Sequence, residues 1–324
     1  MTTPQVSVVI PTHDRCDLLF RHALPTALAQ EDVELEVIVV DDGSRDSTAE
    51  RLRAVADPRV RVVRHDAPRR LAGARNAVIA VASGEWIALL DDDDLWSPIK
   101  LRSQLDAAQS ANASWVYVDT IAVDVDLNVL EADDFPDPER LPELLLTGNH
   151  VPGGGSGVMA RRDVVRRLGG FDEELLFFTD WDLWLRLARD SVPAACTEVL
   201  LARLVHPTNM LFREGPRVLE SLERMIGKHR EVTRGDRLAI AEWVAHRYHV
   251  AGRRFRAAQL YADAAVRYRS LGNVAAAAGA LFGDRGLAAA SRLLRVTRGS
   301  SHLDVMPRSA PDHPAWLEPY RSRA

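Results

Sequence analysis

Four consecutive aspartates, Asp91 to Asp94, follow directly on the apolar run Ile87 to Leu90. Carboxylates this close repel one another, so the arrangement is costly unless a cation lies among them. A divalent metal is the obvious candidate, because oxygen ligands favour hard ions such as Mg²⁺ and Mn²⁺, which keep open positions for nucleotide phosphates. A solvated charge run is the alternative, but it does not explain why the aspartates end an apolar strand. The run therefore indicates phosphate chemistry.

The segments around the aspartates have the order of an open, mostly parallel α/β sheet flanked by helices. Apolar β-branched runs alternate with segments of helical spacing, which is typical of such a sheet. Because ligands collect beyond the carboxyl ends of its strands, the loops Pro11–Asp14, Asp41–Ser44 and Asp91–Asp94 should converge on one crevice. We expect strands at 6–10, 36–40, 60–63, 86–90 and 114–118, and helices at 17–30, 46–55, 73–82 and after residue 98.

The second half of the chain has weaker patterns. Residues 119–142 are acidic and contain prolines, which predicts an irregular excursion with weak strands. The glycines of 153–157 indicate a loop that moves or lets a backbone approach a ligand, and no phosphate-loop lysine follows them. Helices are expected at 161–168 and 180–190.

After residue 208 the sequence predicts Ala- and Arg-rich helices. Gly252, Phe255, Ala264 and Tyr268 match the packing positions of one tetratricopeptide-like hairpin, and one repeat cannot form a solenoid. We therefore expect a helical appendage over 211–297 and a loose tail over 298–324.

Composition limits the classes of protein. The 324 residues are 47% hydrophobic and 27% charged, as in ordinary globular proteins, and a net charge of -5 argues against a general nucleic-acid binder. Cys16 and Cys196 lack metal-ligand spacing and are expected to be reduced thiols of a cytoplasmic protein. We predict no signal peptide and no membrane span, which leaves peripheral association with a membrane open.

Five motifs occur in a recognisable order. They are VSVVIPT at 6–12, VIVVDDGS at 37–44, ARNA at 74–77, LDDDD at 90–94 and DWDLWLR at 180–186. Together they resemble the family 2 glycosyltransferases with the GT-A fold, over about residues 4–210. The resemblance implies a GT-A domain over 1–210, with a nucleotide-sugar-binding half (1–118) and an acceptor-binding half (119–210).

The resemblance also implies a nucleotide site in the first half. Asp42 matches the family's carboxylate that accepts a hydrogen bond from the imide of uracil or thymine, whereas Asp41 and Ser44 fit a turn and helix cap. Arginine is suited to bind a base or a diphosphate. The remaining nucleotide-binding candidates are Pro11, Thr12 and Asp14 of the base pocket, Arg70 and Arg75 near the base or diphosphate, and Asp92 at a ribose hydroxyl.

In the family, the acidic run corresponds to the DxD motif. Asp93 is the expected direct ligand of Mn²⁺ or Mg²⁺, and Asp91 is expected to bind through water or to the ribose. His206 is expected to complete the metal site, since imidazole is an acceptable ligand of Mn²⁺. Asp94 is expected to cap the helix near Pro98. The metal would stabilise the departing nucleoside diphosphate.

Asp180 resembles the family's catalytic base, which takes the proton of the acceptor hydroxyl. Many relatives have Glu-Asp here, whereas this chain has Thr179-Asp180. Trp181 is expected either in the core or at the acceptor site beside the base, and Asp182 is spaced to pair with Arg186.

The sequence thus predicts an inverting, metal-dependent glycosyltransferase that works by single displacement. A UDP-sugar is the favoured donor over dTDP- and GDP-sugars, and the acceptor could be a saccharide, a lipid-linked intermediate or a small molecule. Two alternatives remain open. A nucleotidyltransferase that makes an activated sugar would want a Gly-rich signature after the first strand, and Pro11–Arg15 lacks one. A non-catalytic sugar-nucleotide-binding scaffold would not need to retain Asp42, Asp91, Asp93 and Asp180 together.

Overall fold

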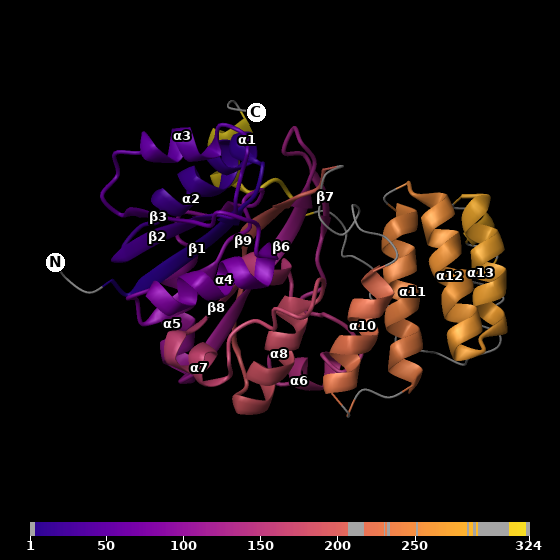
Figure 1. The fold of residues 1–324 in the computed structure, drawn as a ribbon. Helices are drawn as coiled ribbons and strands as arrows, with labels where there is room; N and C mark the ends of the chain where they lie inside the picture. Colours follow the sequence, from indigo (N-terminus) through magenta and orange to yellow (C-terminus); the bar gives the residue numbers. More distant parts are fainter. Residues whose placement is uncertain are drawn as a thin grey trace. The chain divides into compact units, whose positions relative to one another are not determined.

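The computed structural model describes residues 4–206, 217–229, 231, 234–250, 252–283, 285–287, 290 and 311–321. The chain forms two compact units. The sheet unit comprises 1–145, 149–206 and 307–324, and the helical unit comprises 146–148 and 207–306. We describe each unit by itself (Figure 1).

The sheet unit is built on one mixed sheet of nine strands in the order β3-β2-β1-β4-β8-β6-β9-β5, with β7 beside β6. Strands β1 to β4, β6 and β9 run in one direction, and β5, β7 and β8 run in the other. The sheet is therefore mostly parallel, as predicted. The strands are β1 (Val6–Thr12), β2 (Leu35–Asp41), β3 (Val60–Arg64), β4 (Trp86–Leu89), β5 (Leu95–Trp96), β6 (Trp115–Val123), β7 (Val129–Ala132), β8 (Val158–Arg161) and β9 (Ala194–Leu204).

Helices cover both faces of this sheet, which explains why the central strands are apolar on both sides. Val8 of β1 packs in a core with side chains of η1, α2, α3 and α5, whereas Ile87 and Leu89 of β4 face side chains of α4, α7 and α8. The helices are α1 (Cys16–Leu18), η1 (Leu19–Ala23), α2 (Leu24–Leu28), α3 (Thr48–Arg53), α4 (Arg70–Val81), α5 (Lys100–Ala111), α6 (Leu141–Leu144), α7 (Arg162–Arg167) and α8 (Thr179–Asp190).

The second half is more regular than predicted. Strand β6 continues to Val123 and pairs with β7, where we expected an irregular excursion. The glycine run forms the 3-10 turn η2 (Gly154–Gly157). Gly153 has φ +67°, and a Cβ there would lie 2.2 Å from the Leu201 side chain, so close packing explains this glycine.

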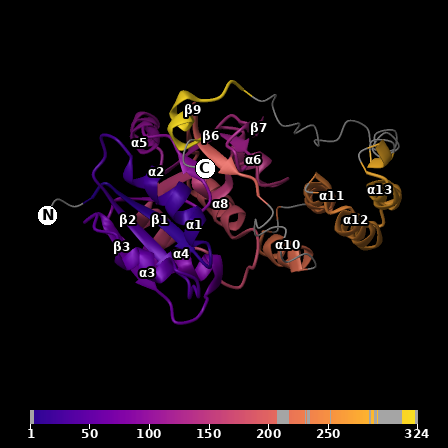
Figure 2. The ribbon, with the colours of Figure 1, turned by 90° about the horizontal axis from the view of Figure 1, so that it is seen from above.

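The end of the chain returns to the sheet unit. Residues 313–321, which we call the C-terminal clasp, contain η3 (Ala315–Leu317) and α15 (Glu318–Arg321). Leu317 is fully buried in an apolar cluster with β6, β7 and β9, and the Trp316 Nε1–H donates to the Val199 carbonyl at 3.0 Å. Figure 2 shows the backbone of the clasp beside β9. The prediction of a loose tail is therefore wrong for 311–321, because these apolar side chains have a core to join; 298–310 lies outside the described residues.

The helical unit contains α10 (Arg217–Lys228), α11 (Arg234–Val250), α12 (Arg254–Tyr268) and α13 (Leu271–Leu281). Ala264 is buried, and the Tyr268 hydroxyl donates to Glu223 of α10. Phe255, predicted as a packing residue, is instead 84% exposed. Among the described residues, none of the helices combines the length and apolarity needed to cross a membrane.

Candidate active site

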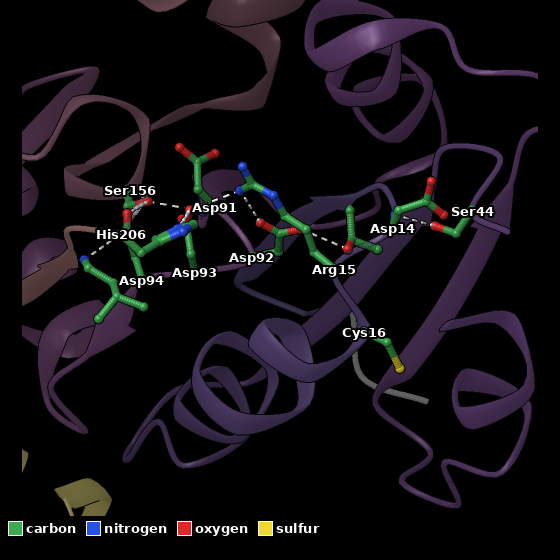
Figure 3. Close-up of polar contacts among 12 residues, drawn as sticks. Asp14, Arg15, Cys16, Ser44, Asp91, Asp92, Asp93, Asp94, Ser156 and His206 are labelled. Carbon is green, nitrogen blue, oxygen red and sulfur yellow. Dashed lines mark hydrogen bonds and ion pairs between the residues drawn. The ribbon is translucent and has the colours of Figure 1, made fainter. Parts of the chain in front are cut away.

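The three loops predicted to converge do so at the carboxyl ends of β1, β2 and β4. The Thr12 hydroxyl donates to Asp92 Oδ2 at 2.7 Å. The Asp14 N–H donates to Ser44 Oγ at 3.1 Å (Figure 3). Hydrogen bonds between residues so distant in sequence join the loops into one wall. The predicted convergence of the three loops is therefore confirmed.

The positive charge that the acidic run requires comes from two arginine side chains of the protein itself. Arg15 Nη1 lies 3.1 Å from Asp92 Oδ1 and 2.9 Å from Asp93 Oδ2 (Figure 3). Arg75 Nη2 lies 2.5 Å from Asp91 Oδ1. Two guanidinium groups thus offset the repulsion among the aspartates. Sequence reasoning expected a metal here and missed Arg15.

The aspartates differ in protonation. Burial, with the charge of Asp93 next in size, raises the pKa of Asp92 to about 7. Burial also raises the pKa of Asp94 well above its ordinary value, with Asp93 and Asp91 adding to the rise. Burial acts on Asp93 in the same direction, but a hydrogen bond from His206 and the charge of Arg15 hold the pKa of Asp93 below its ordinary value. Asp93 is therefore the buried carboxylate held most firmly in its charged form.

Asp94 does not cap the following helix. Its Oδ2 accepts a 2.5 Å hydrogen bond from the Ser156 hydroxyl, and its Oδ1 accepts one from the Leu204 N–H at 3.1 Å. Helix α5 begins after Ile99 without a side-chain cap. The capping prediction is wrong, because Asp94 is buried and joins η2 to the end of β9 instead.

The structure brings two of the three predicted metal ligands together. His206 Nε2 lies 2.9 Å from Asp93 Oδ2, and both side chains are buried. Asp91, which is 35% exposed, is held on Arg75 instead. Within the described parts of the chain, no three His, Cys, Asp or Glu side chains gather as a metal site. An ionised carboxylate beside an imidazole fits a hard divalent cation whose other ligands come from a bound diphosphate or water.

Arg75 links the acidic run to Asp180. Its guanidinium is buried on Asp91 Oδ1, and its charge acts on Asp180. Helix η2 passes so close that a Cβ at Gly155 would lie 2.6 Å from Arg75 Nη2, and one at Gly154 would lie 3.4 Å from Asp180 Oδ2. The glycine run lets the backbone approach, as predicted, but the group approached is the protein's own guanidinium.

Asp180 lies in the first turn of α8, where the helix dipole favours a negative charge. Its Oδ2 accepts a hydrogen bond from Asn149 Nδ2 at 3.2 Å, and its side chain is partly exposed. Burial raises its pKa, the charge of Arg75 opposes this, and the charge of Asp91 adds to it. A carboxylate with a raised pKa is a stronger proton acceptor than one with an ordinary pKa.

Asp42 lies at the other end of the wall. Its Oδ1 accepts hydrogen bonds from His65 Nδ1 at 2.7 Å and from the Arg69 backbone N–H at 2.8 Å. Neither of these donors contacts Oδ2. The neighbouring Asp41 accepts from the Ser44 N–H and pairs with Arg64, as expected for a turn residue.

The other nucleotide candidates differ in exposure. Pro11 is buried in β1, whereas Asp14 is exposed and its Oδ1 accepts from the Arg45 N–H at 2.6 Å. Thr12 and Asp92 are both buried, and the Thr12 hydroxyl donates to Asp92. Arg70 is exposed at the start of α4 with φ +65°.

Trp181 is fully buried, and its Nε1–H donates to the Leu145 carbonyl at 2.8 Å. The structure therefore assigns it to the core, and the prediction that it lines the acceptor site is wrong, since a side chain without exposed surface cannot contact an acceptor. The expected pair of Asp182 with Arg186 is present: Arg186 Nη2 lies 2.6 Å from Asp182 Oδ2.

Four site residues escaped sequence reasoning. Arg15 follows β1, which is the sheet neighbour of β4, so a cation at that strand end was a usable signal. His65 likewise follows β3 beside β2. Asn149 and Ser156 come from loops whose patterns identify no partner. Only the folded chain brings them to Asp180 and Asp94.

Comparisons with known proteins identify the family and the fold of this chain. The model of the family "Glycosyl transferase family 2" matches residues 7–169. The succinoglycan biosynthesis protein ExoO of Rhizobium meliloti (strain 1021) is 36% identical over 190 residues, which are 56% of this chain and 54% of that protein. The Escherichia coli enzyme WfgD, named UDP-Glc:alpha-D-GlcNAc-diphosphoundecaprenol beta-1,3-glucosyltransferase, is 27% identical over 186 residues, 57% of this chain and 70% of WfgD. The match thus spans about half the length of ExoO.

Solved structures support the fold. TarS 1–349 of S. aureus in complex with UDP-GlcNAc has a TM-score of 0.60 at 13% identity, covering 96% of this chain and 98% of that one. The mannosyltransferase PcManGT of Pyrobaculum calidifontis, in complex with GDP-Man and Mn²⁺, has a TM-score of 0.53 at 18% identity, covering 93% and 89%. The sheet unit has the GT-A fold, as the sequence predicted. With a family model that matches half of its length, this chain belongs to glycosyl transferase family 2.

Proposed function

We propose that this protein is an inverting, metal-dependent glycosyltransferase that moves a sugar from a UDP-sugar to an acceptor hydroxyl. The observation that carries the proposal is the convergence of Asp91, Arg75 and Asp180 at one edge of the sheet. Asp180 is the proton acceptor in this arrangement, and Asp91 is the group expected to contact the metal or the ribose of the donor. Family membership argues against a nucleotidyltransferase.

The donor's nucleotide is assigned to the wall between Asp42 and the acidic run. Asp42 Oδ1 is fixed by His65 and Arg69, which orients Oδ2 to accept the imide N–H of uracil. Exposed Arg70 is available to the diphosphate. Relatives support a UDP-sugar, since WfgD is named for UDP-Glc and TarS was crystallised with UDP-GlcNAc. WfgD acts on a diphosphoundecaprenol-linked sugar, and a lipid-linked saccharide is the acceptor class that we favour.

Asp180 then acts as the base of a single displacement. The acceptor oxygen forms a bond to the anomeric carbon from the face opposite the diphosphate, and its proton passes to the Asp180 carboxylate. The bond from the anomeric carbon to the diphosphate oxygen breaks, and its electron pair stays on the diphosphate. Arg75 holds Asp91 and limits the rise in the pKa of Asp180, which keeps Asp180 ionised and ready to accept the proton.

Asp93 and His206 would hold the divalent metal, with Asp91 bound through water or to the ribose. When bound, the metal stabilises the negative charge that grows on the leaving diphosphate. The buried thiols Cys16 and Cys196 suit the cytoplasm, where we propose that the protein works.

The nucleotide assignment is tested by thermal shift with UDP, dTDP and GDP, each with Mn²⁺ or with a chelator. We expect UDP with Mn²⁺ to raise the melting temperature most, and Asp42→Asn to abolish the preference for UDP over GDP. A stronger response to GDP in the unaltered protein would reject the role of Asp42. A UDP response without turnover of any UDP-sugar and acceptor would indicate the non-catalytic scaffold.

The metal assignment is tested with Arg15→Gln, which removes the guanidinium from Asp92 and Asp93. Breaking buried ion pairs costs about 3 kcal/mol when no other cation replaces the lost charge. We expect Arg15→Gln to lower the melting temperature in chelator and Mn²⁺ to restore it more than it stabilises the unaltered protein. The matched control is Arg102→Gln, which removes an exposed ion pair to Asp106. Equal responses to Mn²⁺ in all three proteins would contradict a metal site at Asp93.

A further inference from the structure

The helical unit contains a strongly basic segment in an acidic chain. Residues 251–298 contain nine arginines against Asp263 and Asp284, a net charge of +7. Since the whole chain carries -5, the remaining residues carry -12. Charge asymmetry of this size indicates a segment that binds an anionic partner.

The same segment exposes large apolar side chains. In α12, Phe255 is 84% and Val266 is 82% exposed; in and after α13, Leu271 is 88% and Phe282 is 79% exposed. Scattered apolar side chains are normal on surfaces, but these belong to one helical hairpin. Helix α13 contains no charged residue, and its one polar side chain, Asn273, is fully buried. The exposed face of α13 is therefore wholly apolar.

The two aromatic side chains among these four lie at the same end of the hairpin. Phe255 is at the start of α12, and Phe282 directly follows α13. A Cβ at the adjacent Gly283 would lie 3.1 Å from the Arg254 guanidinium, which brings the two ends together. Arg253, Arg254 and Arg256 are all exposed here. We call Arg253–Arg256 with Phe282 the hairpin tip.

We propose that the hairpin tip docks this protein on an anionic phospholipid surface. Exposed aromatic rings next to arginines suit the boundary between headgroups and acyl chains, because the rings insert while the guanidinium groups bind phosphate. A second copy of this chain is disfavoured as the occupant. In a symmetric contact, each tip would meet the same arginines of its partner and the like charges would repel. The proposal is independent of the donor and of the chemistry at Asp180.

The test is sedimentation of the full chain with vesicles of phosphatidylcholine, alone or mixed with phosphatidylglycerol. We expect binding to the mixed vesicles that weakens with added salt and little binding to the neutral ones. The double variant Phe255→Ser/Phe282→Ser should bind the mixed vesicles at least about tenfold more weakly, because it lacks the two rings that insert into the lipid. Its matched control is Val125→Ser/Leu130→Ser, two exposed apolar residues of the sheet unit, which should bind as the unaltered protein does.

The charge part is tested with Arg253→Gln/Arg254→Gln/Arg256→Gln. At about fivefold per arginine, the triple variant should bind mixed vesicles about a hundredfold more weakly. Equal binding to both kinds of vesicle, no binding at all, or full binding by the phenylalanine variant would overturn the proposal. A dimer in light scattering that the phenylalanine variant dissociates, without vesicle binding, would overturn it in favour of a second copy.

Discussion

The acidic run of the sheet unit and the tip of the α12–α13 hairpin hold their charges in opposite ways. Asp92, Asp93 and Asp94 are at most 6% exposed, and each is held by named partners. At the hairpin tip the arginines are exposed beside bare phenylalanine rings. Removing the partner of a single buried charge is costly, because water cannot replace that partner. Exposed charges act together and each contributes little. Single substitutions should therefore have large effects in the first region and small ones in the second.

The largest effect is expected at Asp180. Asp180→Asn keeps the shape of the side chain but cannot take a proton, so kcat should fall by about 10²- to 10⁴-fold while UDP affinity stays the same. Steady-state kinetics and UDP titration measure the two quantities. The control is Asp190→Asn, at an exposed residue at the other end of α8 whose side chain pairs with Arg167. A kcat within tenfold of normal for Asp180→Asn would exclude Asp180 as the base.

A smaller effect, on stability alone, is expected in the C-terminal clasp. Leu317→Ala removes a fully buried side chain and should lower the free energy of unfolding by about 3 kcal/mol, as other buried leucines do. Phe255→Ala removes a larger side chain that is 84% exposed and should change it by less than about 0.5 kcal/mol. Urea denaturation followed by far-UV circular dichroism gives both values. If the two variants are equally stable, the clasp does not hold the sheet unit together.

Lys100 extends the contrast to a buried cation. It is fully buried, with Nζ 3.9 Å from the centre of the Trp96 ring and 2.8 Å from Gln104 Oε1. Burial lowers its pKa from 10.5 to about 7. Between these values the unfolded chain binds a proton that the folded chain does not, so stability rises with pH from 7 toward 10.5; below pH 7 the cost of burying the charge is complete. Cys196 remains a neutral thiol here, because burial raises its pKa to about 11.

We therefore expect Lys100→Met to remove part of the pH dependence. From pH 7 to pH 9 the unaltered protein should gain about 2 kcal/mol more in stability than Lys100→Met. Urea denaturation at both pH values measures this difference. Lys228→Met, at an exposed position of α10, should keep the pH dependence of the unaltered protein. A difference for Lys228→Met as large as that for Lys100→Met would assign the effect to another group.

The sequence predicted what depends on strand order and local pattern. The parallel first half follows from apolar runs such as Val6–Ile10, and the carboxyl ends of parallel strands lie at one edge of the sheet, so the placement of Asp42 and the acidic run at the same edge could be predicted. The partners of the four aspartates could not be predicted. Arg15 and Arg75 satisfy the aspartates, and Ser156 reaches Asp94 from 62 residues away in sequence. Pairing at that distance depends on tertiary packing, which leaves no periodic signal.

The smallest effect is expected for a single arginine at the hairpin tip. Arg254→Gln should weaken binding to anionic vesicles by about fivefold and leave kcat and the melting temperature unchanged, because the other basic side chains still attract the surface. Arg75→Gln is the counterpart in the buried region. It removes the partner of Asp91 and should lower both activity and the melting temperature. Vesicle sedimentation, kinetics and thermal melting of the two variants compare the regions directly. If Arg254→Gln lowers the melting temperature as much as Arg75→Gln does, the tip arginine has a structural role and the distinction between the two regions fails.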